Sequence, residues 1–211
     1  MTESSGIVKL ENVRLSFPHI AKPGQSTKSA PFKYSGDFVM GSDHPGWGLF
    51  HKTVQGIMVE EWKDKTSAIL EVVNSDRKLR CYGAGNEKRN KKTMEVYDGY
   101  VDQVYISAST EVEKPPQMIR SDGTSAEPFS EEWMILARKL VGGYWVNAVV
   151  RPWLQDNTHG RAIRCNLCGI QFLRKGDSFG RGEEDVSALF GAIPDANADA
   201  PAGLAMPDFM G

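Results

Sequence analysis

The chain has 211 residues, of which 40% are hydrophobic and 25% charged, as expected for one globular domain with a sizeable core. No apolar run is long enough to span a membrane, and the start, MTESSGIVKL, lacks the basic flank and apolar core of a signal peptide. With three cysteines, one of which must stay unpaired, the composition excludes a fibrous protein and a disulfide framework, and predicts a cytoplasmic protein.

Charge is distributed unevenly along the chain. All 25 Lys and Arg lie at or before Arg181, whereas six of the 27 Asp and Glu follow it. Residues 1–182 therefore carry 25 basic and 21 acidic residues, a formal charge of +4, and the remainder carries −6. We expect a basic domain at 1–182 and an acidic, largely disordered C-terminal tail at 183–211, because the tail is rich in Ala, Pro and Gly and has little to bury.

The first half of the chain predicts two strands, a helix and a loop. Residues 7–17 and 32–40 read as strands joined by a Pro-, Gly-, Ser- and Lys-rich loop. In residues 44–64 apolar residues recur at three- and four-residue spacings, which predicts an amphipathic helix. Residues 68–73, AILEVV, are predicted to form a short strand, and residues 76–100 a Gly-, Asn- and Lys-rich loop.

The second half predicts three more strands, at residues 101–110, 142–154 and 161–176, with the hairpin turn QDNTHG between the last two. A short helix is predicted at 130–140, where Ser130 can cap the first turn. Five main strands with one or two helices predict a mainly β fold, an OB-fold-like five-stranded barrel, which binds oligonucleotides on one face and the adjoining loops. The competing architecture is an open antiparallel sheet with the helix on its back.

The strand GGYWVNAVVRPWL, residues 142–154, has two different faces. Because strand side chains alternate, Trp145, Asn147, Arg151 and Trp153 share one face and the opposite face is mostly apolar. Two indoles with an amide and a guanidinium between them suit single-stranded nucleic acid, whose bases stack on aromatic rings and whose phosphates pair with cations. The alternative is that the indoles pack beneath the helix as part of the core.

Cations and aromatic residues are also interleaved in the 76–100 loop. A solvated loop is one interpretation of such a charge run, but the tyrosines that flank it favour a groove for a nucleic-acid strand. The last two strands add further cations, including Lys175. Besides the four residues of the 142–154 strand, the predicted DNA-binding residues are Tyr34, Tyr82, Tyr100, Arg80, Lys88, Arg89, Lys91, Lys92, Arg161, Arg164 and Arg174.

The cysteines do not indicate a metal site. Cys165 and Cys168 form a CxxC, but no second pair follows, and residues three apart in a strand point to opposite faces. We therefore predict no metal and no cofactor.

The alternative to a nucleic-acid-binding protein is an enzyme that acts on nucleic acid, namely a metal-dependent phage nuclease or resolvase. Its candidate ligands are Asp98, Asp102, Glu111 and Glu113, but Asp102 and Glu111 bracket a strand and lie about 30 Å apart at strand rise. No GxSxG, HExxH or Walker motif occurs in the chain. We predict a binding protein and not an enzyme; an interaction module for an acidic protein is the third possibility.

Several segments resemble, in order, those of a bacteriophage single-stranded DNA-binding protein family long catalogued as a domain of unknown function. They are VRLSFPHI, FKYSGDFVM, NEKRNKKTMEVYDGY, VYISAST, YWVNAVVRPWLQDN and CGIQFLRKGDSFG, and the resemblance covers most of residues 7–190. It implies an OB-fold protein that coats single-stranded DNA during phage replication and recombination. Departures from the family pattern are the two cysteines and the end, DFMG, where bacterial tails of this kind end in an aromatic residue.

This resemblance and the charge pattern lead to one functional expectation. The protein binds single-stranded DNA with little sequence preference, and duplex DNA more weakly, as an oligomer or cooperative filament on DNA. Its acidic tail competes with DNA and recruits replication proteins through Asp208 and Phe209.

Overall fold

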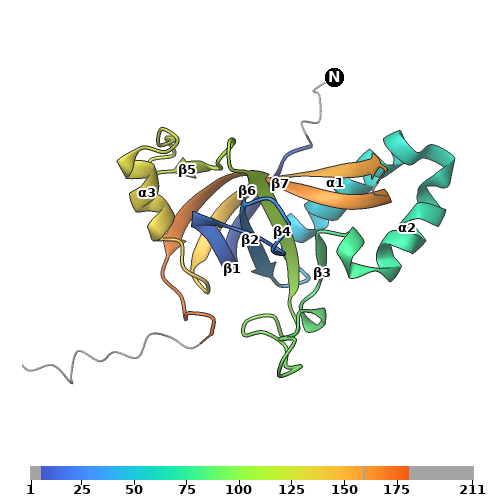
Figure 1. Ribbon diagram of the computed structural model, residues 1–211, viewed down its shortest axis with the longest axis horizontal. Coiled ribbons are helices and arrows are strands. Elements are labelled where there is room, and N and C mark those ends of the chain that lie inside the picture. Colours follow the sequence, from blue (N-terminus) through green and yellow to red (C-terminus); the bar gives the residue numbers. More distant parts are fainter. Residues whose placement is uncertain (1–5, 159, 181–211) are drawn as a thin grey trace, which may run out of the picture. The chain divides into compact units, whose positions relative to one another are not determined.

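The computed structural model describes residues 6–158 and 160–180, all of which belong to one compact unit, Met1–Gly180 (Figure 1). The predicted acidic tail lies outside the described residues. The strands of the described unit are β1 Val8–Gly24, β2 Lys33–Met40, β3 Tyr82–Ala84, β4 Val104–Glu111, β5 Gln117–Ile119, β6 Trp145–Asn157 and β7 Gly160–Arg174. Its α-helices are α1 Pro45–Trp62, α2 Thr66–Ser75 and α3 Glu131–Arg138.

Five strands close into an OB-like ring. Antiparallel pairing joins β4 to β2, β2 to β1, β1 to β6 and β6 to β7, and a parallel bridge between Ser109 and Asn166 joins β7 back to β4. These are the five strands that the sequence predicts, so the mainly β, OB-like fold is confirmed, and the bridge from β7 to β4 favours the predicted barrel over the open sheet. The short strands β3 and β5 pair with β4 and β7 outside the ring.

The core fills the barrel and the space beneath α1. Along β6 the inward residues Val146, Ala148 and Val150 are at most 1% exposed, as strand alternation requires. Helix α1 buries Phe50 and Val54 on one face, which confirms the predicted amphipathic helix. No helix in residues 6–158 and 160–180 is long and apolar enough to cross a membrane.

The predicted strand at 68–73 is wrong, because this segment lies within α2. Ile69 and Val73 are both buried, and residues four apart share one face of a helix. A short apolar run does not distinguish a strand from a helix by itself. With α2 the protein has three α-helices among its described residues, more than the one or two that the sequence predicts.

Strand β1 is longer and less regular than predicted. It continues to Gly24, seven residues beyond the predicted end at Phe17, and its pairing shifts register between Leu10 and Val13 and again between Ser16 and His19. Asn12 and Phe17, one in each irregular stretch, have positive φ angles of 52° and 46°. These irregularities are β-bulges, which re-aim side chains and bend a strand.

The β6–β7 hairpin extends beyond the barrel. Strand β1 pairs with β6 only as far as Val150, whereas β6 and β7 stay paired to Asn157 and Gly160. Figure 1 shows this arm on the side of α1 and α2, with α3 and β5 at the other end of the barrel. Ser130 caps α3 as predicted, because its hydroxyl accepts a hydrogen bond from the Trp133 backbone N–H.

Candidate nucleic-acid interface

The polar face of β6 lies on the outside of the barrel. Trp153 is 40% exposed, Arg151 is exposed and Trp145 is half-buried, whereas the opposite face of the strand forms core. The alternative that both indoles pack in the core is therefore wrong. Eight residues separate the two tryptophans, about 26 Å at strand rise, so they belong to different parts of the surface.

Two guanidinium groups lie close to the Trp145 ring. Arg14 and Arg174 lie over its ring, 5.2 and 4.4 Å from the centroid, a cation–π arrangement. Asn147 is occupied by the protein itself, since its Nδ2 donates to Gln171 Oε1 at 2.8 Å and its Oδ1 accepts from the Asn12 N–H at 2.9 Å. This end of β6 is a packed surface with the exposed Arg174 at its rim.

Trp153 and Arg151 lie where the arm leaves the barrel. The Trp153 indole donates to Asn166 Oδ1 at 3.0 Å, and the register places Ser109 and Arg151 on either side of Asn166. Arg164 faces Trp153 across the hairpin and donates to the Lys78 carbonyl oxygen at 2.9 Å. Polar and aromatic groups from β4, β7 and β6 thus share one outer surface.

The predicted cations of β7 do not all share that surface. Arg174 lies ten residues from Arg164, about 33 Å along the strand, and accompanies Trp145 instead. Arg161 is at the arm, where its Nε forms an ion pair with Asp156 Oδ2 at 2.8 Å. Only Arg151 and Arg164 remain beside Trp153.

The three tyrosines predicted to stack bases are buried, and this part of the prediction is wrong. Tyr34, Tyr82 and Tyr100 are 5%, 8% and 0% exposed. Tyr34 points into the barrel against Trp133, with ring centroids 5.6 Å apart, and Tyr82 packs on Phe50 at 5.7 Å. Burial raises the pKa of all three hydroxyls. None of these rings offers a free face to a base.

Two of the predicted phosphate-binding cations have structural partners. Lys88 Nζ lies 2.6 Å from Asp37 Oδ2, which also accepts from the Tyr100 hydroxyl at 2.7 Å, and Asp37 Oδ1 accepts from Ser107 at 2.5 Å. Asp37 is 7% exposed, so this carboxylate fastens the segment from Lys88 to Tyr100 to β2 and β4. Arg80 is likewise held by Glu87, with 2.9 Å between Nη2 and Oε2.

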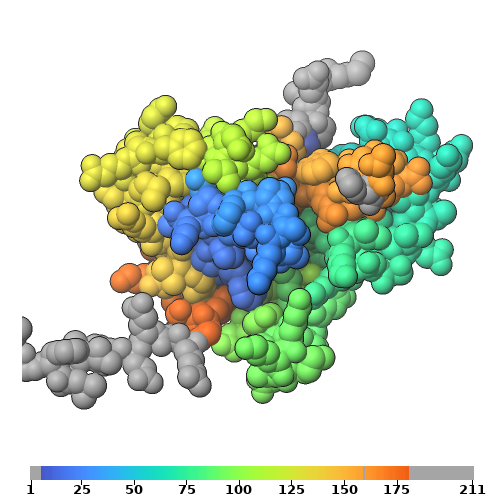
Figure 2. All heavy atoms as spheres, in the orientation of Figure 1, coloured from blue at the N-terminus to red at the C-terminus, as the bar shows by residue number. Residues whose placement is uncertain are grey.

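The exposed cations of this segment line a groove with aromatic residues. One cavity, of about 550 Å³, is lined by Phe17, Asn90 and Tyr97 and by five cations, which are Arg77, Lys88, Arg89, Lys91 and Lys92. In Figure 2 the segment that carries the last four cations (green) projects beside β1 and β2 (blue). Four of these cations, Lys88, Arg89, Lys91 and Lys92, are among the residues that the sequence predicts to bind DNA.

Phe17 forms the aromatic wall, and its backbone is unusual. Its φ of 46° is rare for a bulky residue and lies in a β-bulge, a kind of strain that gathers at functional sites. The ring is 44% exposed and meets Tyr97 edge to face, with centroids 4.9 Å apart. A large apolar ring held in water beside cations is the feature that a stacking platform requires.

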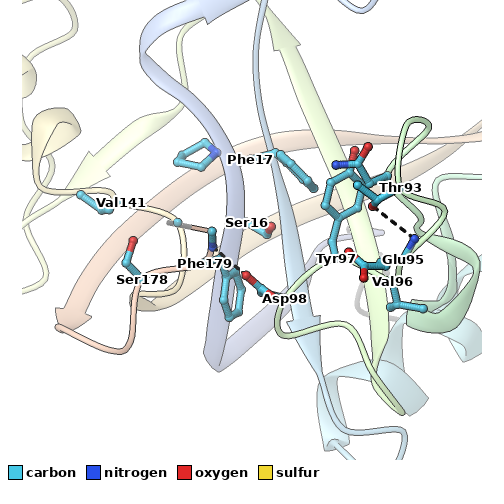
Figure 3. Close-up of a pocket in the computed structure, with 14 residues that line it drawn as sticks. Ser16, Phe17, Thr93, Glu95, Val96, Tyr97, Asp98, Val141, Ser178 and Phe179 are labelled. Atoms are coloured by element: carbon cyan, nitrogen blue, oxygen red, sulfur yellow. Dashed lines mark hydrogen bonds between the residues drawn. The ribbon is translucent and has the colours of Figure 1, made fainter. Parts of the chain in front are cut away.

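A second cavity, of about 480 Å³, continues the groove on the other side of Phe17, Asn90 and Tyr97 (Figure 3). Phe179 from the segment after β7 contributes to its lining. Neither Phe17 nor Phe179 was predicted as a site residue. An aromatic residue before a proline or in a glycine-rich stretch is common, and only the bulge and the return of the chain after β7 bring these two rings to the groove.

No group of three or more His, Cys, Asp or Glu side chains in the described residues is arranged to hold a metal ion. Cys81, Cys165 and Cys168 are free thiols. Cys165 is buried and Cys168 half-buried, as expected for residues on opposite faces of a strand, and burial raises the pKa of both thiols.

Comparison with known proteins gives a consistent result. Residues 7–200 match the family model described as the single-stranded DNA-binding protein of Enterobacter phage Enc34. Protein p50 of Acyrthosiphon pisum secondary endosymbiont phage 1 is 30% identical over 177 residues, which cover 82% of this chain and 85% of that protein.

Two solved structures have a similar fold. The single-stranded DNA-binding protein from bacteriophage Enc34 in complex with single-stranded DNA superposes with a TM-score of 0.64 at 22% identity, covering 84% of this chain and 91% of that one. The structure of the same protein without DNA gives 0.60 at 24% identity, covering 88% and 90%.

Proposed function

This chain belongs to the family of the single-stranded DNA-binding protein of Enterobacter phage Enc34, and we propose that it binds single-stranded DNA along the groove beside Phe17. The observation that carries the proposal is the groove itself, in which two aromatic rings face five cations on the outside of an OB-like barrel. Bases stack on Phe17 and Tyr97, and phosphates pair with the exposed cations Arg89, Lys91 and Lys92. Such contacts read ring faces and backbone charge, so binding tolerates sequence.

The surface around Trp153 provides a second set of contacts. Arg151 and Arg164 supply positive charge beside an indole that is 40% exposed. A strand of DNA that leaves the groove across β4 and β7 reaches this surface, because Ser107 beside Asp37 and Ser109 beside Asn166 share one face of β4. Duplex DNA binds more weakly, since its bases are not free to stack.

In its biological setting the protein coats and protects single-stranded DNA during phage replication and recombination in the host cytoplasm, as an oligomer or cooperative filament. The acidic tail competes with DNA for the cations and recruits replication proteins through Asp208 and Phe209. The charge of residues 183–211, which carry six acids and no base, supports the competition, and the terminal Asp208-Phe209 supports the recruitment. The protein acts by binding and has no catalytic step.

Fluorescence anisotropy with a labelled oligo-dT tests the proposal. We expect tight binding at low salt and a steep loss of affinity as salt rises, because phosphate neutralisation releases counterions. Replacing Lys91 and Lys92 together with alanine reduces the slope of log K against log salt by about 1 to 2. No binding at low salt contradicts the proposal. Magnesium-dependent cleavage of the oligonucleotide, abolished by a chelator, supports the alternative of a phage nuclease.

A further inference from the structure

The groove beside Phe17 has charges of opposite sign on its two sides. The cavity on one side carries only cations among its charged residues, and these are the five named above. The charged residues of the other cavity are Glu95 and Asp98, both acids. Phe17, Asn90 and Tyr97 line both cavities and form the border between them. The two cavities therefore differ in charge across one border of shared residues.

The walls of the acidic cavity are held in place by the protein. Arg14 lies 4.5 Å above the Phe179 ring and donates hydrogen bonds to the Gly143 and Asp177 carbonyl oxygens. A side chain at Gly99 would overlap the Phe179 ring, so the ring packs directly on that backbone. Asp98 Oδ2 accepts from the Gly180 N–H at 3.1 Å. Figure 3 shows Phe179 and Asp98 near each other, and Phe17 with Tyr97 at the border.

We propose that this acidic cavity is a nucleobase subsite that favours bases with an exocyclic amino group over thymine. The inference rests on the proposed function, because it assumes that the DNA backbone follows the cationic cavity. Phosphates are repelled by Glu95 and Asp98, so the backbone stays on the cationic side and the base crosses the aromatic border. The cavity of about 480 Å³ has the size of a small-molecule site.

The preference follows from hydrogen-bond chemistry. An ionised carboxylate only accepts hydrogen bonds. Cytosine presents an amino group at the position where thymine presents a carbonyl oxygen. The cytosine amino group donates to Glu95 or Asp98, whereas the thymine oxygen faces like charge. A cationic side chain of a protein partner also suits aromatic and acidic walls, but the five cations next to the cavity oppose its approach.

Competing pyrimidine oligonucleotides test the subsite. Oligo-dC and oligo-dT of about 12 nucleotides, a length within the range that one OB fold occupies, are titrated at neutral pH, where cytosine is uncharged. We expect the wild-type protein to bind oligo-dC about fivefold more tightly, since a hydrogen bond to a charged group is worth somewhat more than a neutral one. Asp98→Asn and Glu95→Gln reduce this ratio towards one. Glu127→Gln, which removes an exposed acid that does not line this cavity, changes both affinities equally.

The outcomes separate the two proposals. Binding of neither oligonucleotide overturns the proposed function and the subsite with it. Equal binding of both by the wild-type protein overturns the subsite and leaves the proposed function standing. A preference for oligo-dC that persists in both cavity variants also overturns the subsite, because another part of the protein then reads the base. Circular dichroism confirms that each variant is folded.

Discussion

Asp37 is the residue whose substitution tests the anchoring of the cationic segment most directly. Asp37→Asn keeps the shape of the side chain, but it turns one oxygen into an amide NH₂. In the protein one oxygen, Oδ2, accepts from Lys88 and Tyr100, and the other, Oδ1, accepts from Ser107. After the substitution the NH₂ group faces either the Lys88–Tyr100 pair or Ser107, and the side chain no longer carries the charge that pairs with Lys88.

The magnitude follows from these contacts. A hydrogen bond to a charged group contributes about 1.5 to 3 kcal/mol, and the substitution removes the charge that strengthens the bonds from Lys88 and Tyr100. The Lys88 side chain is 21% exposed, so its ammonium group can turn to water and recover part of this energy. We therefore expect Asp37→Asn to lower the free energy of unfolding by about 2 to 4 kcal/mol. Urea denaturation followed by circular dichroism measures it.

For DNA binding by the Asp37→Asn variant, simple electrostatics and the loss of the anchor predict opposite effects. Removing a negative charge beside a cationic groove strengthens DNA binding if electrostatics alone decides. We expect weaker binding, because the segment that carries Arg89, Lys91 and Lys92 loses its anchor on the barrel. Glu60→Gln, which removes a charge from an exposed position in α1, changes stability by no more than about 0.5 kcal/mol. A stable Asp37→Asn variant that binds DNA more tightly than the wild type refutes the reasoning.

Four further outcomes are expected. Phe17→Ala weakens oligo-dT binding by about 1 to 3 kcal/mol in anisotropy titrations and leaves the melting temperature nearly unchanged; a large loss of stability instead identifies the ring as core. Trp153→Ala is expected to weaken oligo-dT binding to a similar extent with little change in melting temperature, and an unchanged affinity shows that the surface around Trp153 does not bind DNA. Burial raises the pKa of Tyr105 to about 12, above its unfolded value near 10, so its contribution to stability is complete below pH 10. That contribution falls by about 2 kcal/mol as the pH rises to 12, and Tyr105→Phe reduces the fall in calorimetry. Ending the chain at Phe190 tightens DNA binding most at low salt, and equal affinities at low salt show that the tail does not compete.

Much of the barrel is predictable because each strand carries its own signal. The alternation in residues 142–154 separates core from surface, and the burial of Val146, Ala148 and Val150 follows that pattern closely. The cationic segment was also evident, because Lys and Arg are costly to bury without a partner and so mark the surface. AILEVV was misread because a run of six apolar and acidic residues fits a buried helix turn as well as a strand.

The residues of the candidate site are predictable from the sequence only in part. The sequence by itself determined that aromatic rings and cations are available on β6 and between Arg77 and Lys92, because residue type and alternation are local properties. Only the tertiary structure decided which rings are free. Tyr82 is buried in the main core and Tyr100 in a second, smaller cluster with Val39 and Tyr105, whereas a bulge at Phe17 leaves that ring exposed beside Tyr97. Whether a ring is buried or exposed depends on which residues of other strands pack against it, and therefore on how strands that are distant in the sequence pair.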